Sequence, residues 1–206
     1  MIQILAFLFP IALSGELQEG DRWTTERTIH FIQESDHVDV NDVDKLDYQV
    51  VRVVAAETTI ALNTTPMANS RTKKSKRITV FHPNGTLISD EDSSNLDLER
   101  INRMEWTALE PRKALSWSRN WRASSTLVEA KVTVKPTSRT TTDTTLLVTY
   151  VEGEKTKAVA TIKVFNELPV IEDLALTINN ADIPGSTKPG SLIVTEKLIE
   201  IHVVGR

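Results

Sequence analysis

The chain contains no cysteine among its 206 residues. This absence excludes disulfide bonds, thiolate zinc sites, iron–sulfur clusters, cysteine nucleophiles and a lipid-modified N-terminal cysteine. Glycine and proline are sparse, with 7 and 8 residues, so the sequence is neither low-complexity nor fibrous. A basic excess is also missing, because the net charge is −4 and the pI is near 5.6. The overall charge therefore argues against nucleic acid as a partner.

Sequence patterns of known catalytic sites are missing as well. The four histidines have no metal-binding spacing, and there is no Gly-x-Ser-x-Gly elbow, glycine-rich phosphate loop or dinucleotide fingerprint. The sequence therefore predicts a protein that is not an enzyme and has no cofactor and no metal centre. The histidines are His30, His37, His82 and His202.

A long hydrophobic run is absent, but a short one lies at the N-terminus. The chain is apolar from Ile4 to Leu13 apart from Pro10, and its first charged side chain is Glu16. Such a run is too short to cross a bilayer, which takes about 20 residues, but it fits a secretory signal. We expect residues 1–15 to be a signal peptide and the chain to be exported, periplasmic or extracellular. A buried N-terminal strand or helix is the alternative.

After Glu16 the sequence is rich in threonine and valine, which favour strands. The alternation is clearest in "TLVEAKVTV", where Val128, Ala130, Val132 and Val134 share one face. The segment "KAVATIKVF" repeats this pattern, and "EGEKT" predicts a hairpin between it and "TLLVTYV". These patterns predict a mainly β, antiparallel protein.

One segment has helical spacing instead. In "NLDLERINRMEW" the residues Leu96, Leu98, Ile101 and Met104 recur at intervals of about three. We expect one or two turns of helix between Leu96 and Arg103, followed by an irregular crossover to residue 114.

Two stretches resemble each other, "GDRWTTERTIHF" and "SRNWRASSTLVEAKV", which align Trp23 with Trp121. Two later pairs of segments follow in the same order at similar offsets, which indicates an internal repeat. We therefore expect a single β domain, residues 16–206, made of two related halves. The halves are residues 16–95 and 115–206, joined by a helical crossover at 96–114, in one curved sheet, half-barrel or sandwich with one short helix.

Two charged runs remain open to more than one interpretation. Residues 36–47 carry five aspartates, which form either a solvated loop between strands or a calcium site. Residues 71–77 carry five basic side chains, which form either a charged loop or a surface that docks anionic lipid or an acidic partner.

The paired "GDRW" and "SRNW" segments carry a family resemblance. The chain resembles uncharacterised exported bacterial proteins whose halves each begin with a Gly-Asp-x-Trp-like motif. Those proteins are similar in outline to periplasmic lipoprotein carriers, in which a curved antiparallel sheet wraps a helix over an apolar cavity. The second segment lacks both the Gly and the Asp. The resemblance implies an apolar ligand and transfers no ligand-binding residue by position.

Together these observations predict a non-catalytic exported protein that binds an apolar small molecule or a protein partner. The alternative is a structural β-sandwich module of a cell-surface assembly. Small alanines on the apolar faces leave room for a pocket under the helix. The predicted ligand-binding residues are Leu98, Ile101, Met104, Trp106, Ala130, Val132, Ala158 and Ala160.

Overall fold

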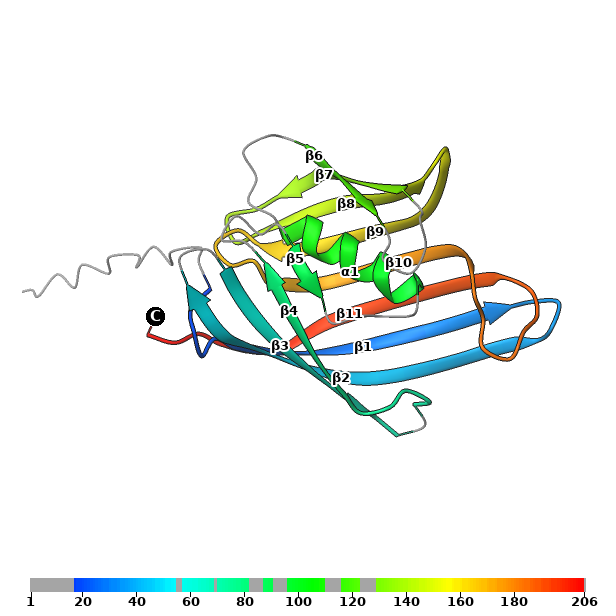
Figure 1. The fold of residues 1–206 in the computed structure, drawn as a ribbon, viewed down its shortest axis with the longest axis horizontal. Helices are drawn as coiled ribbons and strands as arrows, with labels where there is room; N and C mark the ends of the chain where they lie inside the picture. Colours follow the sequence, from blue (N-terminus) through cyan, green and yellow to red (C-terminus); the bar gives the residue numbers. More distant parts are fainter. Residues whose placement is uncertain are drawn as a thin grey trace, which may run out of the picture.

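The computed structural model describes residues 17–54, 57–68, 70–81, 87–90, 96–109, 116–122 and 129–205 (Figure 1). Within these ranges lie one helix, α1 (Leu96–Leu109), and eleven strands. The strands are β1 (Arg22–Gln33), β2 (Val38–Val54), β3 (Glu57–Pro66), β4 (Ser75–Phe81), β5 (Leu87–Asp90), β6 (Trp117–Arg122), β7 (Glu129–Arg139), β8 (Asp143–Glu152), β9 (Lys155–Phe165), β10 (Ile171–Ala181) and β11 (Gly190–His202).

All eleven strands belong to one antiparallel sheet in the order β5-β4-β3-β2-β1-β11-β10-β9-β8-β7-β6. The sheet consists of two meanders, β1 to β5 and β6 to β11, and the first and last strands pair at its centre. Register shifts interrupt several pairings, for example at Thr24/Thr25 of β1, and such bulges increase twist and bending. The predicted curved antiparallel sheet is confirmed, and the described strands do not form a sandwich.

Helix α1 joins the outer edges of the two meanders and lies in the hollow of the curved sheet (Figure 1). It packs on strands β6 to β10. The helix runs to Leu109, so the predicted end at Arg103 is wrong. The buried residues Ile101, Met104 and Ala108 continue the helical spacing, and the helix ends just before Glu110-Pro111, where a residue preceding proline disfavours helix.

The predicted alternation along the strands is confirmed for the described residues. On β7 and β9 the inward side chains are at most 5% exposed: Ala130, Val132, Val134, Ala158, Ala160, Ile162 and Val164. Val128 lies outside the described residues. The predicted hairpin is also confirmed, because β8 and β9 pair directly across Gly153 and Glu154.

The acidic run 36–47 is a strand over most of its length, so the predicted solvated loop is wrong. Strand β2 begins at Val38 and pairs with β1 from there to the end of the run. The valines in the run favour strand, and its inward carboxylates have hydrogen-bonding partners that allow them to be buried.

The two tryptophans of the predicted repeat both lie in strands. Trp23 is near the start of central strand β1, whereas Trp121 is near the end of edge strand β6. The second aligned pair of segments spans hairpins in both cases, β2–β3 and β8–β9, but β7 intervenes only in the second half. The internal repeat stays a prediction.

The core has two parts. The main cluster joins α1 to β7–β11 and includes Ile29 of β1. The second cluster lies where β1 starts and contains Trp23, Leu46, Tyr48, Val50 and Ile60, with Leu17, Leu168 and Val170. Gly190 permits the close approach of β11 to the end of β1, because a Cβ atom there would lie 2.2 Å from the carbonyl oxygen of Ile32.

Candidate functional site: a pocket between α1 and strands β2 to β4

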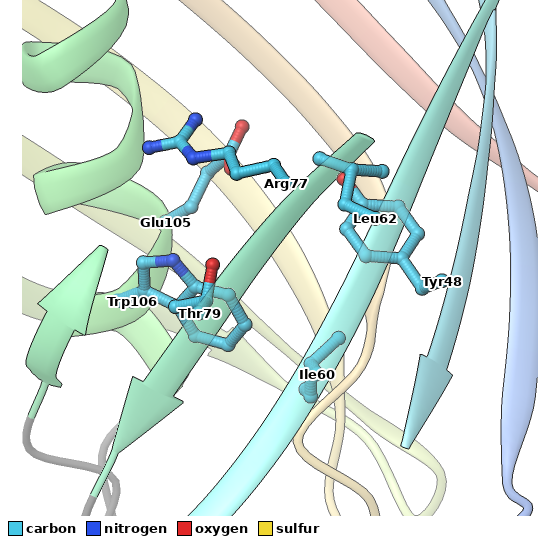
Figure 2. A pocket seen from close by; sticks show the side chains of 7 residues that line it. All are labelled: Tyr48, Ile60, Leu62, Arg77, Thr79, Glu105 and Trp106. Carbon is cyan, nitrogen blue, oxygen red and sulfur yellow. The ribbon is translucent and has the colours of Figure 1, made fainter. Parts of the chain in front are cut away.

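A small pocket separates α1 from the first meander (Figure 2). Its apolar lining comes from Tyr48 of β2 and from Ile60 and Leu62 of β3. The volume open to the centre of a water molecule is about 10 Å³, which is room for about one water molecule. The remaining lining residues are Arg77 and Thr79 of β4 and Glu105 and Trp106 of α1.

The register of the sheet explains why these residues meet. Tyr48 pairs with Leu62, which pairs with Arg77, and Ile60 pairs with Thr79, so two adjacent rows across β2, β3 and β4 face α1. Behind the pocket the Tyr48 ring stacks on Trp23, with ring centroids 5.0 Å apart and planes 8° apart. This stacking fixes one wall of the pocket, because a buried aromatic pair resists rotation of either ring.

A buried network of charges lies beside the pocket. Arg27 of β1 donates from Nε to Glu196 Oε2 of β11 at 2.7 Å and from Nη2 to Glu105 Oε1 of α1 at 2.8 Å. The second oxygen of Glu196 accepts hydrogen bonds from Thr25 Oγ1 at 2.6 Å and from Tyr48 Oη at 3.1 Å. All five side chains are buried. The network therefore joins α1 to the centre of the sheet.

This environment keeps the network in one charge state near neutral pH. Burial raises the pKa of the Tyr48 hydroxyl well above 10.0, and the charge of Glu196 raises it further. Burial alone would lower the pKa of Arg27, but Glu196 and Glu105 outweigh it, so that pKa lies above its usual range. The Tyr48 hydroxyl therefore stays protonated and donates, and Arg27 stays charged, which suits binding and positioning.

A second set of ion pairs fixes the start of α1. Arg100 donates from Nε to Glu152 Oε1 of β8 at 2.8 Å and also bonds Asp97 one turn earlier. Asp97 accepts a hydrogen bond from the backbone N–H of Asp182 at 3.2 Å. The first turns of α1 are thus attached to the second meander, whereas Glu105 and Trp106 face the first.

The structure brings six of the eight predicted ligand-binding residues together. Ile101, Met104, Ala130, Val132, Ala158 and Ala160 are 0–5% exposed and belong to the main cluster. Trp106 belongs with the second cluster and lines the pocket. Leu98 lies in α1, but its side chain is outside the described part of the chain. A ligand pocket among the six buried residues stays a prediction.

Sequence reasoning missed the other pocket residues and the charge network. The strand "RWTTERTIHF" places Arg27 on the same face as Trp23 and Ile29, which was a signal that an inward position carries a charge. Arg77 belonged to the basic run, and its inward position became evident only from its pairing with Leu62.

The aspartates of the run 36–47 have separate partners. Asp42 accepts from Arg71, Asp44 from Ser70 and Thr72, Asp47 from Thr24, and Asp36 from Ser186. Among the described residues no group of three or more His, Cys, Asp or Glu side chains could hold a metal ion. Nor does the described part of the chain contain a helix long and apolar enough to span a membrane.

No protein-family model and no curated protein matches the chain. Among solved structures, one of lipovitellin concerned with lipid–protein interactions has a TM-score of 0.49 and 10% identity. It covers 93% of this chain, which spans only 26% of the lipovitellin chain.

Two bacterial structures cover similar shares of the chain. A domain described as an outer membrane lipoprotein-sorting protein, from Vibrio parahaemolyticus, has a TM-score of 0.28 and 9% identity over 90% of this chain and 86% of its own. A DUF1329 family protein from Desulfovibrio piger has a TM-score of 0.27 and 9% identity over 91% and 88%. At these levels the three structures assign neither family nor function.

Proposed function

We propose that the chain is a non-catalytic binding protein that holds an apolar or amphiphilic ligand between α1 and strands β2 to β4. The pocket lined by Tyr48, Ile60 and Leu62 carries this proposal, because its lining combines apolar side chains with a few polar ones. Small-molecule sites have this composition: mostly apolar walls with a few polar groups that orient the ligand.

The present volume holds no organic ligand, so binding requires the side of α1 near Trp106 to separate from β4. The helix has other attachments that can stay in place during such a movement. Helix α1 packs directly on β6 to β10, and Arg100 fixes it to β8. Glu105, which bonds Arg27, links the helix to β1 of the first meander through side chains. Separation of α1 from β2 to β4 therefore leaves the main cluster intact.

A fluorescent dye that is sensitive to the polarity of its surroundings tests this function. Anilinonaphthalene sulfonate has an apolar ring system and one negative charge, so its fluorescence should rise saturably with the native protein. Leu62→Trp should weaken this binding at least about tenfold, because the larger side chain fills the pocket. Thr59→Trp is the matched control, since Thr59 lies on the opposite face of β3.

A long-chain fatty acid should displace the dye from the native protein and from the Thr59 variant. Urea midpoints of both variants verify that each is folded. Equal dye binding by the two variants, or none by the native protein, would reject the pocket as the binding site.

The proposal places the protein in the cell envelope or extracellular space. The apolar run from Ile4 to Leu13 supports export. Mass spectrometry of the exported chain should show an N-terminus at Gly15 or Glu16, and an intact Met1 on chain recovered from the cytoplasm would contradict it.

A further inference from the structure

The basic run 71–77 divides into two arginines and three lysines with different surroundings. Arg71 donates to both carboxylate oxygens of Asp42, from Nε at 3.1 Å and Nη2 at 3.0 Å, and its guanidinium lies 5.0 Å from the centre of the Phe31 ring. Arg77 faces the pocket. The three lysines, Lys73, Lys74 and Lys76, are exposed. Both arginines therefore contact other parts of the sheet or line the pocket, whereas the three lysines are exposed to solvent.

The segment that carries the lysines is firmly attached to the sheet. The backbone N–H of Arg71 donates to Asp42 at 2.8 Å, and Ser70 Oγ donates to Asp44 at 2.9 Å, as does Thr72 Oγ1. Both aspartates are buried, at 3% and 2% exposure. These bonds attach residues 70–72 to β2 and reduce the entropy lost when the neighbouring lysines bind a partner.

We propose that the β3–β4 connection, together with Lys76 at the start of β4, is a docking surface for an anionic lipid bilayer. Lys73, Lys74 and Lys76 supply three exposed positive charges, whereas Asp44, which accepts hydrogen bonds from Ser70 and Thr72, is buried. Each lysine near an anionic membrane contributes about fivefold to binding at physiological salt. The whole chain has a net charge of −4, so an anionic membrane attracts this basic surface and repels the rest of the molecule.

An exposed apolar side chain favours lipid over an acidic protein or a nucleic acid. Met67 begins the connection, and the residue is 44% exposed. Its carbonyl accepts the N–H of Ser70, so it lies at the same end of the β3–β4 hairpin as Lys73 and Lys74. An apolar group beside lysines matches the boundary between headgroups and acyl chains. Lysines suit the diffuse charge of such a surface, whereas arginine suits bidentate contacts.

Co-sedimentation of the full chain with lipid vesicles tests the proposal. Phosphatidylcholine vesicles measure any binding by the apolar N-terminal run, and vesicles that also contain phosphatidylserine measure the charge-dependent part. The combined variant Lys73→Gln, Lys74→Gln, Lys76→Gln should lose about a hundredfold of the charge-dependent affinity. The matched control, Lys131→Gln, Lys135→Gln, Lys155→Gln, removes three exposed lysines from the second meander and should retain it.

Met67→Ser should weaken binding to the anionic vesicles severalfold but leave binding to soluble polyglutamate unchanged. Three results would overturn the proposal. They are the absence of charge-dependent vesicle binding, an equal loss of vesicle affinity in both triple variants, or an affinity for polyglutamate that equals the affinity for vesicles. The last result would identify an acidic protein as the partner. None of these readouts depends on the pocket, so the proposed ligand-binding function is tested separately.

Discussion

Arg27 lies between two glutamates from distant parts of the chain, Glu105 of α1 and Glu196 of β11, and all three side chains are buried. The group carries one positive and two negative charges, and the second carboxylate oxygen of Glu196 accepts hydrogen bonds from both Thr25 and Tyr48. A buried ion pair is not in itself strongly stabilising, because removing the charges from water costs about as much as their attraction returns. Its specific effect here is to link Glu105 of α1 to the two central strands, β1 and β11.

Removal of Arg27 should therefore be costly. Arg27→Met removes the buried positive charge that bonds both Glu105 and Glu196, so we expect a loss of about 3–5 kcal/mol in the free energy of unfolding. Urea denaturation measures this loss. The control Arg22→Met changes an exposed residue of the same strand and should alter stability by less than about 0.5 kcal/mol. A similar small effect at Arg27 would mean that solvent reaches the network.

The period-two pattern was sufficient to predict which residues of β7 and β9 face inward, since their inward positions are all apolar. The same pattern could not predict the network on β1. A charge at an inward position is stable only with a partner, and the partners of Arg27 lie 78 and 169 residues away in sequence. Such pairs depend on strand order, which local patterns do not determine.

Among the elements, the connection between β3 and β4 is attached to β2 mainly through Asp42 and Asp44. Burial alone would raise the pKa of Asp42, but its hydrogen bonds from Arg71 outweigh burial and lower that pKa below 3.8. A carboxyl group whose pKa is lower in the folded state than in the unfolded state stabilises the fold at pH values above its unfolded pKa, which is near 3.9. This contribution disappears as the pH falls through the folded pKa.

Arg71→Met should consequently destabilise the protein by about 1–2 kcal/mol at pH 7. The difference from the unaltered protein should shrink as the pH falls below about 4, because Asp42 then becomes protonated in both. Urea midpoints measured at a series of pH values give this difference. Arg71→Lys keeps the charge but loses the two-pronged contact, so its stability should lie between those of the unaltered protein and Arg71→Met. A stability difference that does not change with pH would assign the effect to packing on Phe31.

Element boundaries were predicted less well than faces. The helix was expected to end at Arg103 because the segment from Thr107 onward shows no clear periodicity, yet Thr107 and Ala108 are both fully buried. Small side chains give a weak periodic signal, although they allow a helix to approach a sheet closely. The acidic run was predicted as a loop because of its many aspartates. Its valines, Val38, Val40 and Val43, nevertheless favour a strand, and the β3–β4 connection supplies the hydrogen bonds that the buried carboxylates need.

At the scale of the whole molecule, the two meanders are joined by the pairing of β1 with β11 along nearly their full length. The main cluster extends across this junction, because Ile29 of β1 packs with residues of the second meander and α1. The charge network crosses the same junction through Arg27 and Glu196. Neither meander therefore has a complete core of its own.

We accordingly expect a single cooperative unfolding transition. Far-UV circular dichroism reports on the whole sheet, and tryptophan fluorescence reports on Trp23 in the first meander and on Trp117 and Trp121 in the second. The two signals should coincide through urea denaturation, as they do when one core unfolds as a unit. A chain ending before Gly190 should not fold, because loss of β11 leaves β1 and β10 without their shared partner and uncovers the inward face at the centre of the sheet. Separate transitions, or a folded truncated chain, would show that each meander is an independent domain.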